Sequence, residues 1–229
     1  MHPLLVFLVP LGGQRYELYC ERHHTGPEEP PASGSGWFAG LREKFSVMLR
    51  QAEETDDAAP PPDGLLARLR ARMMAWVAER VAEQRLLWNL RGRDAAVVTH
   101  ADDLPFEQVM EIVRTSLRAD HGRHLRWLIV DTLLFVGSGV FFFVPGPNLI
   151  AYFFAFRVVG HWLSMRGAAD GRDKTAWTGR PSPQMTALRA AVARPAHERA
   201  RAIEPLAREL DLHRLTVFVD RMCGGAKNA

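Results

Sequence analysis

The chain has 229 residues, of which 47 % are hydrophobic and 24 % charged, as in ordinary globular proteins. The net charge is +3, and the two cysteines, Cys20 and Cys223, lie near opposite ends. These totals exclude a protein with many membrane spans, a disulfide framework and a zinc-type cysteine spacing, so any membrane signal must be local.

The first 21 residues are expected to form a β-hairpin. Two apolar or aromatic runs, Leu4–Val9 and Arg15–Glu21, flank the pair Gly12 and Gly13. The N-terminus lacks the basic region of a secretory signal and the Arg- and Ser-rich pattern of a mitochondrial transit peptide. We therefore expect a bacterial inner membrane as the location, with most of the chain in the cytosol.

Residues 37–120 are expected to form a cytosolic helical region. Helical spacing of apolar residues predicts helices at Trp37–Glu54 and Leu65–Leu90, separated from the hairpin and from each other by loops rich in Pro and Gly. The short apolar run 95–99 is a candidate third strand that would join the first hairpin in a small sheet.

A further helix should begin after Asp102 and Asp103, either of which can act as its N-cap, and Pro105 suits its first turn. The apolar residues spaced along one face of this helix are expected to be buried: Phe106, Val109, Met110, Val113 and Leu117.

Residues 125–168 contain the most apolar part of the chain. The run Trp127–Val144 carries one formal charge, Asp131, and approaches the ~20 residues that a helix needs to cross a bilayer. A turn of four residues follows, Pro145, Gly146, Pro147 and Asn148, and then a second apolar arm. Because proline stops a helix and asparagine can cap one, this pattern predicts a helical hairpin in or on a membrane.

Counting outward from the turn places Asp131 and His161 at the same depth, ~22 Å from the tip, with Arg157 about one helical turn deeper. Charges in lipid normally find partners, so Asp131, Arg157 and His161 are predicted to form an ionisable cluster across the hairpin. Small residues would let the two arms approach closely: Gly137, Ser138, Gly139, Gly160 and Ser164.

Basic residues before and after the hairpin, such as Arg126 and Arg166, favour a cytoplasmic side for both ends. Whether the tip crosses the bilayer or stops inside it is left open. A soluble protein that buries an aromatic hairpin with Asp131 paired to Arg157 is the alternative.

After the hairpin, residues 170–183 are expected to be a polar loop. Helices are predicted within 184–222, at Gln184–Arg194, Ala196–Leu210 and Leu212–Met222, with Asp211 as a cap of the last one. The predicted fold is thus mainly α with a small N-terminal β-hairpin or sheet, and with a helical hairpin inserted in or on a membrane.

The hairpin resembles the mitochondrial K+/H+ exchange-related proteins. The likeness is carried by the PGPN turn at 145–148, the sequence YFFAF at 152–156, Arg157 followed by His161, and the pair at 167–168. Weaker similarity lies upstream, in the LVFLVP start and before ADDLPFE, so that about residues 1–170 are covered. The resemblance implies a membrane-associated protein linked to potassium–proton exchange, with no established catalytic residues.

Two functions remain in view. The first is an accessory or oligomeric component of monovalent cation/proton homeostasis, in which Asp131 exchanges a proton for a cation and a histidine such as His161 takes up protons near neutral pH. The second is a non-transporting scaffold or interaction protein, either anchored in a membrane or soluble. Two short arms cannot enclose a transport pathway alone, because transporters use many spans around a central site.

The expected partners are membrane lipid, a second copy of the chain or a larger membrane protein, and a monovalent cation as a candidate ligand.

No catalytic motif is present, so we expect neither an enzyme nor a cofactor. His121 and His124 fit a solvated pair better than a metal site. The arginines at 68, 70 and 72 fit a solvated or lipid-facing stripe, so no nucleic-acid partner is expected.

Overall fold

The computed structural model describes residues 3–21, 86–138 and 149–224, which fall into two compact units. The described residues of the second unit are 127–138 and 149–162, and the remainder belong to the first unit. The helices expected at 37–54 and over 65–85, and the turn at 145–148, lie outside the described residues.

The first unit contains a mixed sheet of four strands in the order β2-β1-β3-β4. The strands are β1 (Leu4–Pro10), β2 (Tyr16–Tyr19), β3 (Ala95–Ala101) and β4 (Ala176–Ser182). β2 pairs antiparallel with β1, whereas β3 runs parallel to both β1 and β4. The prediction of a mainly helical protein with a small sheet is confirmed, and β3 covers the run expected as a third strand.

β1 is apolar throughout because both of its faces are covered. Successive side chains of a strand point to opposite faces. Leu4, Val6 and Leu8 accordingly contribute to one hydrophobic cluster. Phe7 and Val9 contribute to a second cluster on the other face. A strand that is buried on both sides loses the alternation of polar and apolar residues, as β1 does.

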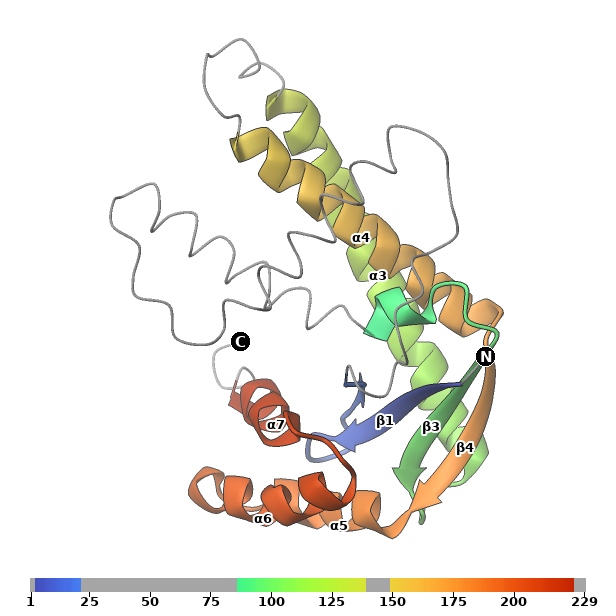
Figure 1. Cartoon of the computed structure of the whole chain (residues 1–229), viewed down its shortest axis with the longest axis vertical. Coiled ribbons are helices and arrows are strands. Elements are labelled where there is room, and N and C mark those ends of the chain that lie inside the picture. Colours follow the sequence, from blue (N-terminus) through green and yellow to red (C-terminus); the bar gives the residue numbers. More distant parts are fainter. Residues whose placement is uncertain (1–2, 22–85, 139–148, 225–229) are drawn as a thin grey trace. The chain divides into compact units, whose positions relative to one another are not determined.

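Each face of the sheet is covered by its own set of helices. The first cluster joins the sheet to the helical residues 86–90, to the first half of α3 (Phe106–Ser138) and to the end of α4 (Leu149–Asp173). The second cluster joins it to α5 (Pro183–Val192), α6 (Ala196–Glu209) and α7 (Leu215–Gly224). Figure 1 shows these three C-terminal helices gathered beside the sheet. The first unit is therefore layered as helix, sheet and helix.

The turn between β1 and β2 follows the predicted hairpin. Gly12 and Gly13 both have positive φ angles, 91° and 62°, which glycine adopts without a steric penalty. The backbone amide of Leu11 donates to the carbonyl oxygen of Arg15 across the turn at 2.9 Å. The two glycines thus belong to a strand reversal.

α3 and α4 supply both arms of the predicted hairpin as far as the structure describes them. Within residues 3–21, 86–138 and 149–224, none of the helices combines the length and the apolar character that a membrane span requires. Membrane insertion of the arms stays a prediction.

The expectation of a polar loop at 170–183 is wrong. α4 continues to Asp173, and β4 then forms an edge strand. Gly and Pro within β4 and its largely exposed side chains hide the strand signal, since an edge strand tolerates both features. Trp177 anchors the strand, because its indole Nε1 donates to the carbonyl oxygen of Gly171 at 2.7 Å.

The C-terminal helices lie close to their predicted positions, and a residue from the first hairpin contacts the start of α7. The carboxylate of Glu21 accepts the backbone amides of His213 and Arg214, at 2.9 and 2.8 Å. A negative group at a helix N-terminus satisfies amides that lack a partner within the helix. Glu21, at the end of the first hairpin, therefore contributes to the cap of α7, while the predicted capping role of Asp211, which has a positive φ of 57°, stays a prediction.

The two aspartates before α3 contact α5. The carboxylate of Asp103 forms a bidentate ion pair with Arg189, with N···O distances of 2.6 and 3.0 Å. The carboxylate of Asp102 accepts a hydrogen bond from the hydroxyl of Thr186. The predicted burial of the α3 face holds for Val109, Val113 and Leu117. Phe106 is exposed and Met110 half-buried, so the predicted burial fails at these two positions.

Candidate functional site

The second unit contains an ion cluster between its two described helical segments. Asp131 on α3 has a fully buried side chain, with an exposed fraction of 0 %. Its Oδ2 accepts from Nε of Arg157 at 2.9 Å and lies 3.2 Å from Nε2 of His161, both on α4. The structure thus brings together the three residues that the sequence predicts to meet.

Helical spacing explains the contact. Residues four positions apart lie on the same face of a helix. Phe153, Arg157 and His161 therefore share one face of α4, and Trp127 and Asp131 share one face of α3. Asp131 and His161, which the count from the predicted turn pairs, are in contact.

Aromatic rings surround the guanidinium of Arg157. Its central carbon lies 5.6 Å from the ring centroid of Trp127 and 5.7 Å from that of Phe153. The ring of His161 stacks on Trp127, with centroids 6.5 Å apart and planes inclined by 17°. Cations are attracted to aromatic faces, so Arg157 is stabilised by two rings as well as by a carboxylate. Sequence analysis missed Trp127 and Phe153, although each lies four positions from a predicted charge.

Asp131 has one unsatisfied oxygen. Oδ1 is buried and has no hydrogen-bond partner within the described part of the chain, in contrast to Oδ2. Buried polar atoms almost always have a partner, because leaving one without costs about 1–3 kcal/mol.

The outer surface around this cluster is apolar. Leu133 and Val136 are 68 % and 69 % exposed, and Ile129 is more than half exposed. Other large apolar side chains of the second unit are exposed as well: Trp127, Val130, Leu134, Phe135 and Trp162. The described part of the second unit thus buries its charged residue Asp131 and exposes apolar side chains, which is the reverse of the pattern in a helix that faces water.

Two of the small residues predicted to bring the arms together can be examined, while the side chain of Ser138 and the whole of Gly139 lie outside the described residues. A Cβ added to Gly137 would meet nothing within 4 Å, so this glycine borders open space. Ser164 accepts a hydrogen bond from the indole Nε1 of Trp88 at 2.9 Å. Nearby, a Cβ on Gly167 would overlap the carbonyl oxygen of Leu87. Gly167 therefore packs closely against a neighbouring backbone inside the first unit, while close approach of the two arms stays a prediction.

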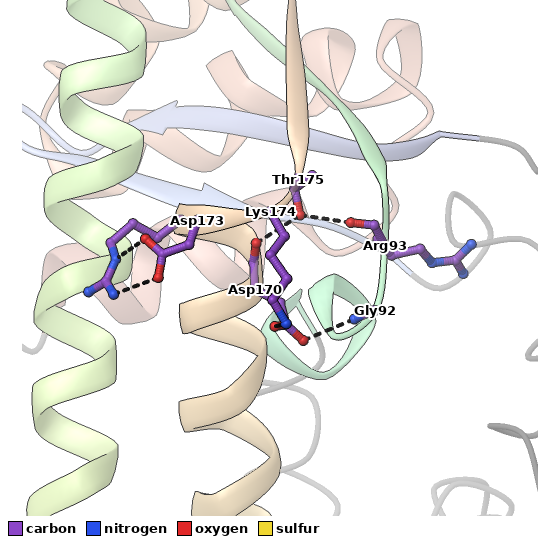
Figure 2. A network of polar contacts seen from close by, with 7 residues as sticks. Gly92, Arg93, Asp170, Asp173, Lys174 and Thr175 are labelled. Carbon is purple, nitrogen blue, oxygen red and sulfur yellow. Dashed lines mark hydrogen bonds and ion pairs between the residues drawn. The ribbon is translucent and has the colours of Figure 1, made fainter.

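The first unit has a polar network where α4 passes into β4, shown in Figure 2. Asp170 pairs with Lys174 at 2.8 Å and accepts the backbone amide of Gly92 at 3.2 Å. Burial by itself raises the pKa of Asp170, but the hydrogen bonds from Lys174 and Gly92 outweigh it and hold the pKa below its ordinary value. Thr175 donates to the carbonyl oxygen of Arg93, which ties the junction to β3. This network is structural.

A second carboxyl group of the first unit has the opposite environment. Burial, reinforced by the nearby negative charge of Asp120, raises the pKa of Glu17 to about 7, and Arg123 opposes the shift only in part. Burial also raises the pKa of Asp120. In the described parts of the chain, no three His, Cys, Asp or Glu side chains gather as metal ligands would.

The comparison with protein families agrees with the resemblance found in the sequence. Residues 89–170 match the family described as mitochondrial K+-H+ exchange-related, which confirms the likeness for this part of the chain. The matched segment contains Asp131, Arg157 and His161, and it begins after the first hairpin. No curated protein and no solved structure matches the chain.

Proposed function

We propose, from the K+-H+ exchange-related domain at residues 89–170, that this protein is a membrane-associated component of monovalent cation/proton exchange. In this proposal the helical segments 127–138 and 149–162 lie in lipid. The helix–sheet–helix layers of the first unit remain in water. The protein takes part in ion exchange and catalyses no chemical reaction.

The observation that carries the proposal is the apolar exterior of the 127–138 segment. Monomeric proteins in water rarely expose contiguous apolar surface on this scale, and such a surface marks contact with a membrane or a protein. Ile129, Leu133 and Val136 follow one another at helical spacing and are each more than half exposed. Lipid is the environment in which such side chains lose nothing by facing outward.

The buried ion cluster supports the same interpretation. Ionisable residues within membrane helices face the protein interior and pair with one another. Asp131 is paired with Arg157 and His161 in this way. Exposed Arg123 and Arg126 precede the apolar segment, and Arg166 follows it. Under the positive-inside rule, these flanking cations favour a cytoplasmic first unit in a bacterial inner membrane.

An accessory role fits the chain better than that of a complete carrier. Secondary transporters enclose a central site between repeated bundles of helices. Two helical arms supply too few walls, so we propose that the protein acts as a homo-oligomer or with a larger membrane protein. A monovalent cation is then a ligand of the assembly.

Vesicle flotation tests membrane binding with matched variants. Val136 and Val217 are valines with the same exposed fraction, 69 %, on α3 and α7. Val136→Glu should sharply lower the fraction of protein that floats with lipid vesicles, while Val217→Glu should leave it unchanged. Recovery of the wild-type protein away from the vesicles would reject the proposal.

Ion flux tests the second part of the proposal. In proteoliposomes that contain the assembly, a K+ gradient should drive proton flux that Asp131→Asn abolishes. Flux with the full assembly but none with this chain alone would support the accessory role. Flux that is unchanged by Asp131→Asn would separate the cluster from exchange.

The alternative is a scaffold that does not transport ions. It is favoured by one observation: Arg157 and His161 both contact the same oxygen of Asp131, as in a pair that only fixes two helices. A scaffold should retain membrane or partner binding after Asp131 and Arg157 are exchanged for a size-matched apolar pair. An exchange component should lose proton flux in the same variant.

A further inference from the structure

We propose that the first unit binds an organic cation, an alkylammonium or guanidinium group, in a pocket beside the outer edge of β2. The pocket has a volume of about 470 Å³, and small-molecule sites usually span about 300–1,000 Å³. Its walls include Leu11 and Glu17 of the first hairpin, Glu111 and Ile112 of α3, and Met222 of α7. The site is separate from the ion cluster of the second unit, so the inference goes beyond the proposed function.

The fold places this pocket at the edge of the sheet. α3 packs on one face of the sheet and α7 on the other, and β2 is an outermost strand. A pocket with walls from all three elements therefore lies beside the outer edge of β2. The amide of Leu11 donates to Arg15, so the alternation of an antiparallel pair turns the amide and carbonyl of Tyr16 outward. The backbone thus adds a carbonyl acceptor to this edge.

Carboxyl groups outnumber cations at the pocket. Glu17 and Glu111 line it, and Asp120 and Arg123 of α3 act on Glu17 electrostatically. Arg123 is 62 % exposed and 3.5 Å from Asp120, while Arg15 lines the pocket but is exposed and donates to a backbone carbonyl of its own hairpin. Within the described residues, three carboxyl groups thus stand against two exposed guanidinium groups, although the whole chain has a net charge of +3. This balance favours a positively charged ligand.

Glu17 has the environment of a carboxyl group that gains from a cationic partner. Burial, more than the charge of Asp120, raises its pKa to about 7, and Arg123 lowers it only in part. The charged form of Glu17 is therefore poorly stabilised in the protein by itself. A cation that enters the pocket stabilises that form and lowers the pKa.

Apolar walls favour an organic cation over a bare ion. Leu11, Ile112 and Met222 line the pocket beside its polar groups. An alkyl chain gains free energy when it leaves water against such side chains, whereas K+ gains none and needs several oxygens in place of its hydration shell. The hydroxyl groups of Thr115 and Ser116 can accept N–H groups of an ammonium or guanidinium ligand. The lining thus matches a cationic group attached to an alkyl chain.

NMR spectroscopy of methionine methyl groups in the purified full chain tests the site. The Met222 signal, identified by its loss in Met222→Leu, reports on the pocket that this residue lines. At pH 8, n-butylammonium should shift this signal saturably, while K+ and the neutral analogue 1-butanol should not. Absence of a saturable shift with n-butylammonium, or binding of 1-butanol with equal affinity, would overturn the proposal.

A pair of glutamate variants tests the role of Glu17. Glu17→Gln should weaken n-butylammonium binding at pH 8 by about tenfold, as expected when a hydrogen bond to a charged group is lost. Glu107→Gln is the matched control, because Glu107 is an exposed glutamate of α3 that does not line the pocket. Equal affinities in the two variants would refute the role of Glu17. If Glu17→Gln does not fold, the comparison of n-butylammonium with 1-butanol still decides the proposal.

The pH dependence of binding is a readout that a purely structural role of Glu17 would not produce. An alkylammonium stays charged between pH 6 and pH 8, so its affinity should follow the ionisation of Glu17. Because the pKa of Glu17 is about 7, affinity should fall by about tenfold from pH 8 to pH 6. Asp120→Asn should move this transition to lower pH, since the charge of Asp120 raises the pKa of Glu17. A wild-type affinity that is constant over this range would contradict the proposal.

A peptide distinguishes two sources of the cation. The blocked pentapeptide TVKVT presents an ammonium group on a strand that can pair with the outward backbone of Tyr16. Binding that is tighter than that of n-butylammonium, and is lost when norleucine replaces the lysine, would support a peptide segment as the source. Equal affinities would support a free organic cation. Neither result depends on vesicle binding or ion flux, so the proposed function and this site can fail separately.

Discussion

In the first unit, apolar side chains from both faces of the sheet are enclosed by helices, whereas the described part of α3 in the second unit carries apolar side chains outward. The buried carboxylates differ in their partners. Asp170 and Glu21 of the first unit accept backbone amides, while Asp131 contacts Arg157 and His161 between α3 and α4. The first unit thus buries its apolar side chains, whereas the described part of α3 in the second unit exposes them beside a buried ion cluster.

Breaking the ion cluster should have the largest effect on stability. Arg157→Leu leaves the buried Asp131 without its guanidinium partner and with the His161 imidazole still beside it, and removing one member of a buried ion pair typically costs about 3–5 kcal/mol. Hydrogen exchange should then accelerate across 127–138 and stay unchanged across the β1–β3 pairing. Adding Asp131→Leu should recover most of the loss, and a double variant as unstable as the single one would contradict the ion-pair account.

Truncating a leucine on α3 should have very different costs in the two units. Leu117 is fully buried in the first unit, so Leu117→Ala should lower the free energy of unfolding by about 2–5 kcal/mol. Leu133 is 68 % exposed, so Leu133→Ala should have little effect on unfolding and should weaken vesicle binding instead. Chemical denaturation of both variants measures the two losses in free energy of unfolding. Equal losses would contradict the expected difference between the two units.

Two glycines offer a smaller but well-matched test. Gly167→Ala places a methyl group against the carbonyl oxygen of Leu87 and should cost about 1–3 kcal/mol by overpacking. Gly137→Ala meets open space on a helix and should stabilise by up to about 1 kcal/mol. Thermal unfolding measures both. A harmless Gly167→Ala would show that α4 and residues 86–90 are not closely packed.

Glu17 should produce a modest pH dependence in the first unit. Because its pKa is raised from 4.5 to about 7 in the folded state, the unfolded chain releases this proton at lower pH than the folded chain. Stability should therefore fall as pH rises from about 4.5 to about 7. Glu17→Gln should flatten that slope in denaturation series across this window, whereas an unchanged slope would assign it to other groups.

Local signals were sufficient for much of the fold. The apolar runs around Gly12 and Gly13 predicted the hairpin, and helical periodicity placed the three C-terminal helices. β4 was not predictable, because an exposed edge strand with Gly179 and Pro181 has the composition of a loop. The cap of α7 by Glu21 was also hidden, since its partners lie about 190 residues away in the chain.

The candidate site was predictable for a different reason. Charged residues are rare in an apolar run, so three residues stand out: Asp131, Arg157 and His161. Counting residues outward from the predicted turn then pairs them across the two arms. The aromatic partners of Arg157 were overlooked among many similar residues. Burial of one carboxylate oxygen without a partner depends on side-chain geometry, to which sequence patterns give no access.

The environment of Leu133 is the most direct test of the central claim that the apolar exterior of α3 lies in lipid. A spin label at Leu133→Cys, in a protein with Cys20 and Cys223 replaced by serine, is compared with one at Arg114→Cys on the exposed part of the same helix. We expect the label at 133 to relax more readily with oxygen than with an aqueous nickel complex, and the label at 114 to show the reverse. Equal access of the nickel complex to both positions in membranes would contradict the account.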